Sequence, residues 1–136
     1  MACLDTTFWI DFMRSPNNQK HRAADQALRL LRQSGQPITT TRFNVAELLA
    51  GVEFEADAIT ARQKLDAAMS NVAILDFDEA ACERFAKIDR YLRQRGLRIG
   101  DMDMLIASTA YVNNEAVYTR NVAHFRLVPG LQVVEY

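Results

Sequence analysis

Three acidic residues, Asp5, Glu47 and Asp103, each stand beside or within an apolar run of the sequence. A carboxylate in apolar surroundings must be protonated, paired or bound to a cation. Carboxylate oxygens are the ligands that Mg²⁺ or Mn²⁺ prefers, and water and phosphate can complete the coordination. A divalent ion stabilises the charge that develops on a phosphodiester during in-line attack and activates a bound water. We therefore expect these three acids to hold Mg²⁺, or Mn²⁺, for phosphodiester chemistry.

Asp5 and Glu47 each have a simpler interpretation when they are taken alone, whereas the position of Asp103 favours an ionised ligand. Asp5 precedes a predicted helix, where Asp is a favoured N-cap, and capping is the better explanation of that residue by itself. Glu47 is equally well explained as an exposed side chain flanked by small residues. Asp103 lies in the first turn of another predicted helix, where free backbone N–H groups keep a carboxylate ionised. Asp101 directly follows Gly100 and is assigned to N-capping, with a secondary metal or water contact left open.

The elements that must position these acids alternate between strands and helices. Short apolar runs predict strands at residues 2–4, 38–41, 72–75, 116–119 and 131–135. Helical periodicity predicts helices around residues 7–13, 24–31, 45–52, 61–68, 79–95 and 101–112. Strands joined through helices form parallel sheets. We therefore predict one α/β domain over residues 1–136, with a mainly parallel central sheet of four to five short strands flanked by helices on both sides.

Polar residues after the fourth predicted strand complete the candidate site. Thr119 and Asn121 follow that strand, as Asp5 follows the first. The carboxyl ends of parallel strands meet at one edge of a sheet, where such folds bind ligands. A Thr-Arg-Asn sequence at a strand end is by itself usually only a turn. Their shared edge, rather than either residue alone, indicates a site.

Composition narrows the remaining possibilities. The 136 residues are 49% hydrophobic and carry a formal net charge of -1, which gives no general attraction for nucleic acid. No apolar run is long enough to cross a bilayer, and no secretory signal begins the sequence, so we expect a cytoplasmic protein without membrane contact. Cys3 and Cys82 have no CxxC partner and are expected to be inert core thiols.

Four segments together resemble the motifs of PIN domains in VapC-type toxins. They lie in the family's order and cover nearly the whole chain: Leu4-Asp5-Thr6-Thr7-Phe8-Trp9-Ile10-Asp11, Ala46-Glu47-Leu48-Leu49-Ala50-Gly51, Ile99-Gly100-Asp101-Met102-Asp103-Met104-Leu105-Ile106-Ala107, and Thr119-Arg120-Asn121 with His124-Phe125 and Val128-Pro129-Gly130-Leu131. The resemblance implies a PIN-like fold in which Asp5, Glu47 and Asp103 are metal-binding catalytic acids. Asn121 would occupy the fourth catalytic position. Many relatives have Asn in place of Thr7 and Asp in place of Asn121, which leaves the number of metal ions open.

The same resemblance implies an activity and partners. The chain would be an endoribonuclease that cleaves tRNA, rRNA or mRNA, would form a homodimer, and would be inhibited by a cognate VapB-like antitoxin. One alternative is a non-catalytic PIN-fold module that binds RNA or protein. Another is phosphotransfer with Asp5 as the phosphoacceptor, which the absence of a lysine near the late strands disfavours.

The surface that would face RNA is less well defined by the sequence. Six basic residues from loops or element ends are candidates for phosphate contacts: Arg14, Lys20, Arg22, Arg42, Arg98 and Arg120. Both histidines, His21 and His124, lack metal-ligand spacing and are expected to be structural. Phe8 and Trp9 are expected in the core or a dimer contact rather than under RNA bases.

Overall fold

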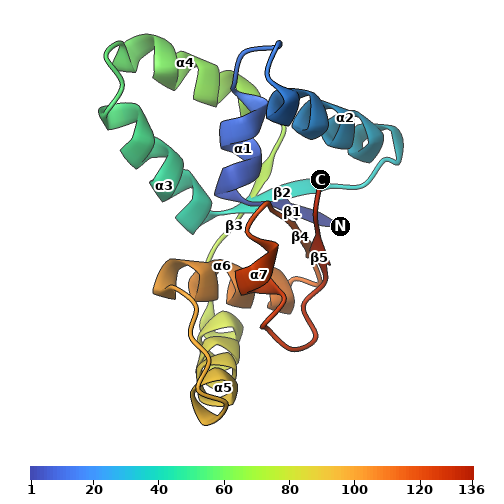
Figure 1. Ribbon diagram of the computed structural model, residues 1–136, viewed down its shortest axis with the longest axis vertical. Helices are drawn as coiled ribbons and strands as arrows, with labels where there is room; N and C mark the ends of the chain where they lie inside the picture. The colour runs from blue at the N-terminus through green and yellow to red at the C-terminus, as the bar shows by residue number, and fades with distance from the viewer.

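The computed structural model describes residues 1–136 and contains a five-stranded sheet (Figure 1). Its strands, in the spatial order β3-β2-β1-β4-β5, are β1 (Ala2–Leu4), β2 (Ile38–Thr41), β3 (Ala73–Leu75), β4 (Ala116–Tyr118) and β5 (Val133–Val134). Every neighbouring pair of strands is parallel. The predicted parallel sheet is therefore confirmed, although the third, fourth and fifth strands are shorter than expected.

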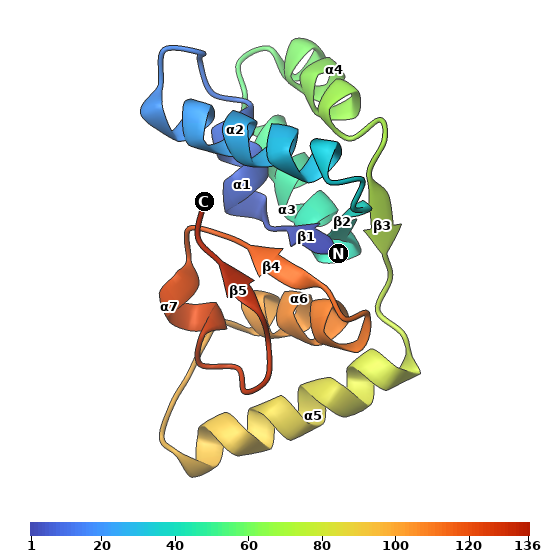
Figure 2. The same ribbon diagram turned by 90° about the vertical axis from the view of Figure 1, so that its right-hand side faces the viewer.

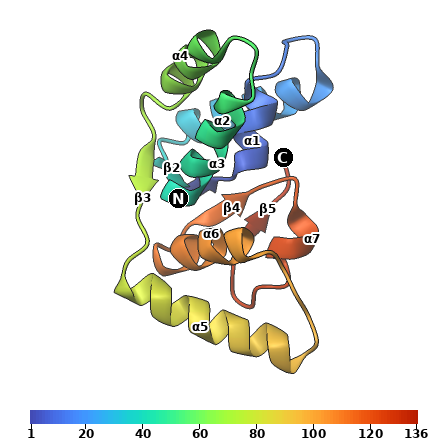
Figure 3. The ribbon, with the colours of Figure 1, turned by 90° about the vertical axis from the view of Figure 1, so that its left-hand side faces the viewer.

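Seven helices cover the two faces of this sheet (Figures 2 and 3). They are α1 (Thr6–Phe12), α2 (Gln19–Gln33), α3 (Arg42–Glu53), α4 (Ala58–Ala68), α5 (Glu79–Gln94), α6 (Asp101–Val112) and α7 (Val122–Phe125). The first four lie on one side of the sheet and the last three on the other, with α5 outermost. The prediction of helices on both sides is confirmed, whereas the short helix α7 was not anticipated.

Two apolar clusters fill the space between the sheet and its helices. Side chains alternate along β1, so Ala2 and Leu4 join the cluster under α1 to α4, and Cys3 joins the cluster under α5 to α7. Phe8 and Trp9 are fully buried in the first cluster, as expected for core residues. The central strand β1 is thus covered on both faces, and only Asp5 separates its carboxyl end from the start of α1.

Two expectations from the sequence are wrong. Asp101 is the first residue of α6 rather than its N-cap, because Gly100 has the extended backbone of the capping position. Cys82 is exposed on α5, because the buried stripe of that helix runs through Ala81, Ile88 and Leu92. Cys3 is buried as expected. None of the helices is both long enough and apolar enough to span a membrane.

Candidate active site

Asp5 lies at the junction of β1 and α1, with only 3% of its surface exposed. It occupies the N-cap position of α1, but its side chain caps no backbone N–H of that helix. Instead, Oδ1 accepts a hydrogen bond from Asn44 Nδ2 at 3.0 Å, and Oδ2 accepts one from Thr119 Oγ1 at 2.8 Å. The expected N-cap position of Asp5 is therefore confirmed, but its side chain makes no capping hydrogen bond. The carboxylate faces α3 and the end of β4.

Asn44 is a site residue that the sequence analysis missed. It is fully buried in the first turn of α3, where it forms a capping box with Thr41. Its Oδ1 accepts from the Thr41 backbone and hydroxyl, so its amide nitrogen is directed to Asp5 and to Thr6 Oγ1, both at 3.0 Å. The Thr-x-x-Asn spacing at a predicted helix start was the available signal, because a capping box fixes where the Asn side chain points.

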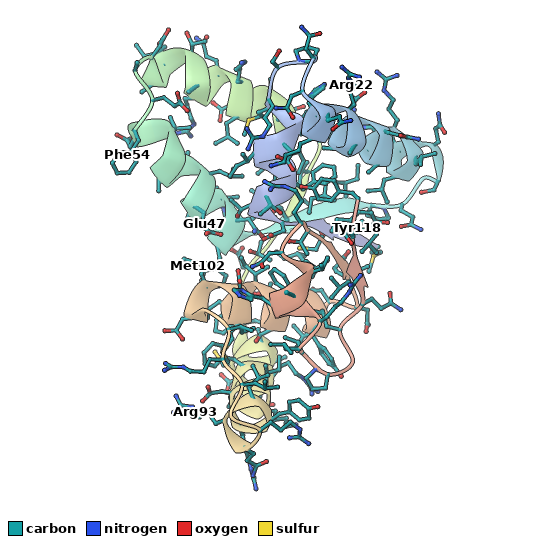
Figure 4. All side chains as sticks on the ribbon, viewed as in Figure 1. Arg22, Glu47, Phe54, Arg93, Met102 and Tyr118 are labelled. Atoms are coloured by element: carbon teal, nitrogen blue, oxygen red, sulfur yellow. The ribbon has the colours of Figure 1, made fainter.

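Glu47 lies one turn further along α3 and is half-buried. Its Oε1 accepts a hydrogen bond from Thr6 Oγ1 at 2.7 Å, which ties the helix to the residue that follows Asp5. In Figure 4, Glu47 lies on the part of α3 that faces the start of α6, where Met102 is labelled. The exposed-surface interpretation of Glu47 is therefore wrong.

Asp103 lies in the first turn of α6, and 22% of its side chain is exposed. Its Oδ2 accepts from Asn121 Nδ2 at 2.9 Å and lies 2.9 Å from His124 Nδ1. His124, on the unanticipated helix α7, is thus part of this site rather than a purely structural residue. His21, by contrast, bonds the backbone oxygen of Phe12 through Nδ1, as a structural residue would.

Burial and neighbouring negative charge raise the pKa of two acids of this site, Asp5 and Glu47. Burial raises the pKa of Asp5, opposed by the Thr119 hydrogen bond and reinforced by the negative charge of Asp103. Burial also raises the pKa of Glu47, and the charges of Asp5 and Asp103 add to that effect. No arginine or lysine forms an ion pair with any of the three acids. The one basic side chain paired with these acids is His124, at Asp103, and it is charged only when it is protonated.

The donor set fits a hydrated divalent cation. The recorded hydrogen bonds of Glu47 and Asp103 each use one carboxylate oxygen, so each residue has a second oxygen to offer. No three His, Cys, Asp or Glu side chains converge closely enough to enclose an ion by themselves. Mg²⁺ is usually bound through one or two carboxylates and keeps several waters, so full enclosure is not required.

Comparisons with known proteins bear on this arrangement. The model of the PIN domain family matches residues 2–130. The chain belongs to the PIN domain family. It is 34% identical to Ribonuclease VapC19 of Mycobacterium tuberculosis over 133 residues, which are 97% of this chain and 98% of that protein. It is also 34% identical to Ribonuclease VapC2 of Rickettsia felis over 87 residues, 64% of this chain and 65% of the relative. Within the PIN domain family, the chain belongs with the VapC ribonucleases.

Solved structures agree with this PIN domain assignment. The chain matches VapBC2 from Rickettsia felis, solved bound to a DNA fragment from their promoter, with a TM-score of 0.88 and 28% identity over 99% of this chain and 98% of that one. It matches VapBC-1 from nontypeable Haemophilus influenzae with a TM-score of 0.83 and 25% identity over 98% and 96% of the two chains. The predicted PIN-like fold is therefore confirmed.

Thr7, where many PIN domain relatives have Asn, contributes a hydroxyl to the same site. Its Oγ1 lies 3.3 Å from both Asp5 Oδ2 and Thr119 Oγ1. The same oxygen accepts a hydrogen bond from the Arg120 backbone N–H at 3.1 Å. The Thr7 hydroxyl thus forms a polar link between the end of β1 and the end of β4.

Proposed function

We propose that this protein is a metal-dependent endoribonuclease, the toxin of a VapBC-type pair, and that residues 1–136 form its single PIN domain. The observation that carries the proposal is the placement of Asp5, Glu47 and Asp103 from three separate segments at one edge of the sheet, with no fixed cation beside them. Membership of the VapC ribonucleases supports the same activity.

The metal, Mg²⁺ or Mn²⁺, would be held by Asp5, Glu47 and Asp103 and would supply an activated water and charge stabilisation. Asn44, Thr119 and Thr6 keep the carboxylates of Asp5 and Glu47 in place through hydrogen bonds. Asn121 holds Asp103 by its amide N–H and, being uncharged, adds no negative charge for a second ion. This supports a site that holds one metal ion rather than two.

The partners follow from the same family membership. The structural neighbours are VapBC complexes, which supports a VapB-like antitoxin as the partner of this chain. RNA, as tRNA, rRNA or mRNA, is the substrate that the names of the ribonuclease relatives support. The homodimer and the cytoplasmic location stay predictions from the sequence.

Phosphotransfer at Asp5 is disfavoured by the residues around the late strands. No lysine stands there that could neutralise a phosphoryl group on Asp5.

The proposed function is tested by incubating antitoxin-free protein with total cellular RNA and Mg²⁺ or Mn²⁺, and by mapping the new 5′ ends by sequencing. We expect discrete cuts that require metal, that EDTA abolishes, and that Asp5→Asn removes. RNA or protein binding that ignores metal, without any cleavage by the wild type, would instead establish the non-catalytic PIN-fold module.

A further inference from the structure

The ion pairs of the structure differ in how arginine and aspartate are matched. Four pairs join one arginine to one aspartate: Arg29–Asp25, Arg42–Asp76, Arg62–Asp66 and Arg93–Asp89. Asp11, in contrast, pairs with both Arg14 and Arg120. One carboxylate neutralises only one guanidinium, so this cluster keeps a surplus positive charge. It is the only such surplus among the ion pairs.

Asp11 holds both arginines from inside the protein. It lies on α1 and is fully buried, and its Oδ1 accepts from Arg14 Nε at 2.9 Å. Tyr136 donates its hydroxyl to Oδ2 at 2.8 Å. Burial alone would raise the pKa of Asp11, but the bonds from Arg14 and Tyr136 and the charge of Arg120 lower it below the ordinary value. Asp11 is therefore a fixed anion that orients two cations.

The cluster adjoins the acidic site along two paths. Arg120 stands between Thr119 and Asn121 in the chain, and its backbone N–H donates to Thr7 Oγ1. Arg14 forms part of the wall of a cavity of about 700 Å³ between α1, α3 and α4, whose other charged lining residues are Glu47, Glu55, Asp57 and Lys64. The side chains of Arg14 and Arg120 are 38% and 33% exposed, so solvent-facing N–H groups remain beside the bonds to Asp11.

We propose that Asp11 is a positioning residue that fixes Arg14 and Arg120 as a binding site for the RNA phosphates that flank the cleaved bond. The inference rests on the proposed ribonuclease function. A net charge of -1 gives the chain no general attraction for RNA, so phosphate binding must come from local surplus charge. An anchored guanidinium also loses little conformational freedom when it binds a phosphate.

Arg14 lies too far along the chain from the acidic site to contact the phosphate that the acids would act on. Arg14 follows Thr7 by seven residues along and just beyond α1, which corresponds to roughly 10 Å. It would therefore contact a neighbouring phosphate and not the one that is cleaved. Of the other candidates, Arg42 is paired with the exposed Asp76, and Arg22 bonds the backbone oxygen of Asn17. Neither belongs to a cluster with surplus charge.

The test compares Arg14→Gln with Arg93→Gln, which removes the same charge from a one-to-one pair on α5, far from Glu47 in Figure 4. Fluorescence anisotropy with a labelled single-stranded RNA of mixed sequence is measured in EDTA over a range of salt concentrations. We expect Arg14→Gln to weaken binding about fivefold and to reduce the salt slope by about one. Its KM for cleavage rises while kcat changes by less than about twofold. Arg93→Gln should change none of these.

A second pair of variants tests the role of Asp11 itself. Asp11→Asn raises the net positive charge of the cluster by one, yet it should weaken RNA binding, because it releases both arginines from their fixed positions. If Asp11→Asn does not fold by circular dichroism, Tyr136→Phe replaces it, since this variant removes one bond to Asp11 and leaves every charge in place. It should weaken binding by about twofold.

Equal RNA affinity of Arg14→Gln and Arg93→Gln would overturn the proposal. A lower kcat for cleavage in Arg14→Gln, with RNA affinity and KM unchanged, would also overturn it. These binding results do not depend on cleavage. A wild type that binds RNA in this way but never cuts it would contradict the proposed function and leave the phosphate site standing.

Discussion

Asp5 and Asp11 lie six residues apart at the start of the chain, and both are buried, with 3% and 0% of their surfaces exposed. Their pKa values are nevertheless shifted in opposite directions. Burial raises the pKa of Asp5, and its hydrogen-bond donors are the neutral side chains of Thr119 and Asn44. At Asp11, the bond from Arg14, the bond from Tyr136 and the charge of Arg120 together outweigh the effect of burial and lower the pKa. Burial alone therefore does not decide the charge of an acid in this fold.

The two aspartates differ in whether the chain itself supplies a cationic partner. The chain supplies two arginines to Asp11 but none to Asp5, although Arg120 stands directly after Thr119, which bonds Asp5. A buried carboxylate without a partner is costly at neutral pH. The acidic site is thus suited to accept a divalent ion, while the Asp11 cluster is complete without one.

The largest expected effect is on catalysis. Asp5→Asn keeps a side-chain oxygen for the bond from Asn44 but removes the charge that we propose binds metal. We expect RNA cleavage to fall by about 100-fold or more, measured as the initial rate with Mg²⁺ or Mn²⁺. Asp89→Asn, which removes the same charge on α5, should cleave as the wild type does. Comparable cleavage rates in Asp5→Asn and Asp89→Asn would contradict a special role of Asp5 among the aspartates.

The next effect is on stability at the other aspartate. Asp11→Asn leaves Arg14 and Arg120 without their shared anion. We expect the free energy of unfolding in urea to fall by about 2 kcal/mol at pH 7, less than for a fully buried pair because both arginines are partly exposed to solvent. Because the folded pKa of Asp11 is lowered, this deficit should shrink as the pH falls below the ordinary aspartate value. A deficit that is independent of pH would contradict the role of its charge.

Asn44→Ala should weaken both stability and activity. It removes the donor to Asp5 Oδ1 and the capping box of α3. We expect the free energy of unfolding to fall by about 1.5 kcal/mol and the cleavage rate to fall by less than in Asp5→Asn. Asn18→Ala is the matched control, since Asn18 caps α2 away from the acids. It should lose about 1 kcal/mol of stability with unchanged cleavage. If Asn44→Ala also cleaves RNA at the wild-type rate, Asn44 has no role in positioning Asp5 for cleavage.

The smallest expected effect concerns the pH dependence of stability. The folded pKa of Asp5 is raised, so its ionisation opposes folding, and this cost grows as the pH rises from the unfolded pKa through the folded pKa. In metal-free buffer, Asp5→Asn should unfold at a higher urea concentration than the wild type at pH 7. The advantage should disappear as the pH falls below the unfolded aspartate pKa of about 3.9. A variant less stable than the wild type at pH 7 would show that Asp5 contributes favourably as an anion.

Much of the site could be predicted because the acids follow features of local sequence. The apolar run before Asp5 and the nearly all-apolar helix around Asp103 predicted the elements that carry these acids. The expected parallel sheet predicted that Asp5 shares its edge with Thr119 and Asn121. Parallel strands joined by helices left few other arrangements. Glu47 followed from the same reasoning, since a carboxylate on a mostly buried helix needs a partner.

The parts that were missed depend on contacts between distant segments. Asn44 resembled an ordinary capping residue, and only the packing of α3 beside β1 turns its amide toward Asp5. His124 reaches Asp103 from α7, a helix of four residues that is too short to show periodicity. The pairing of Asp11 with Arg120 joins positions more than a hundred residues apart, and no local pattern reports it.

The most direct test is whether the acidic site binds a divalent metal ion, since the chain places no arginine or lysine against its acids. Thermal unfolding of the wild type, Asp5→Asn and Asp11→Asn is followed at neutral pH as Mn²⁺ or Mg²⁺ is added. A ligand that binds only the folded state raises the Tm with its concentration. We predict that metal raises the Tm of the wild type and of Asp11→Asn but not of Asp5→Asn. An equal rise in all three proteins, or none in the wild type, would contradict the account.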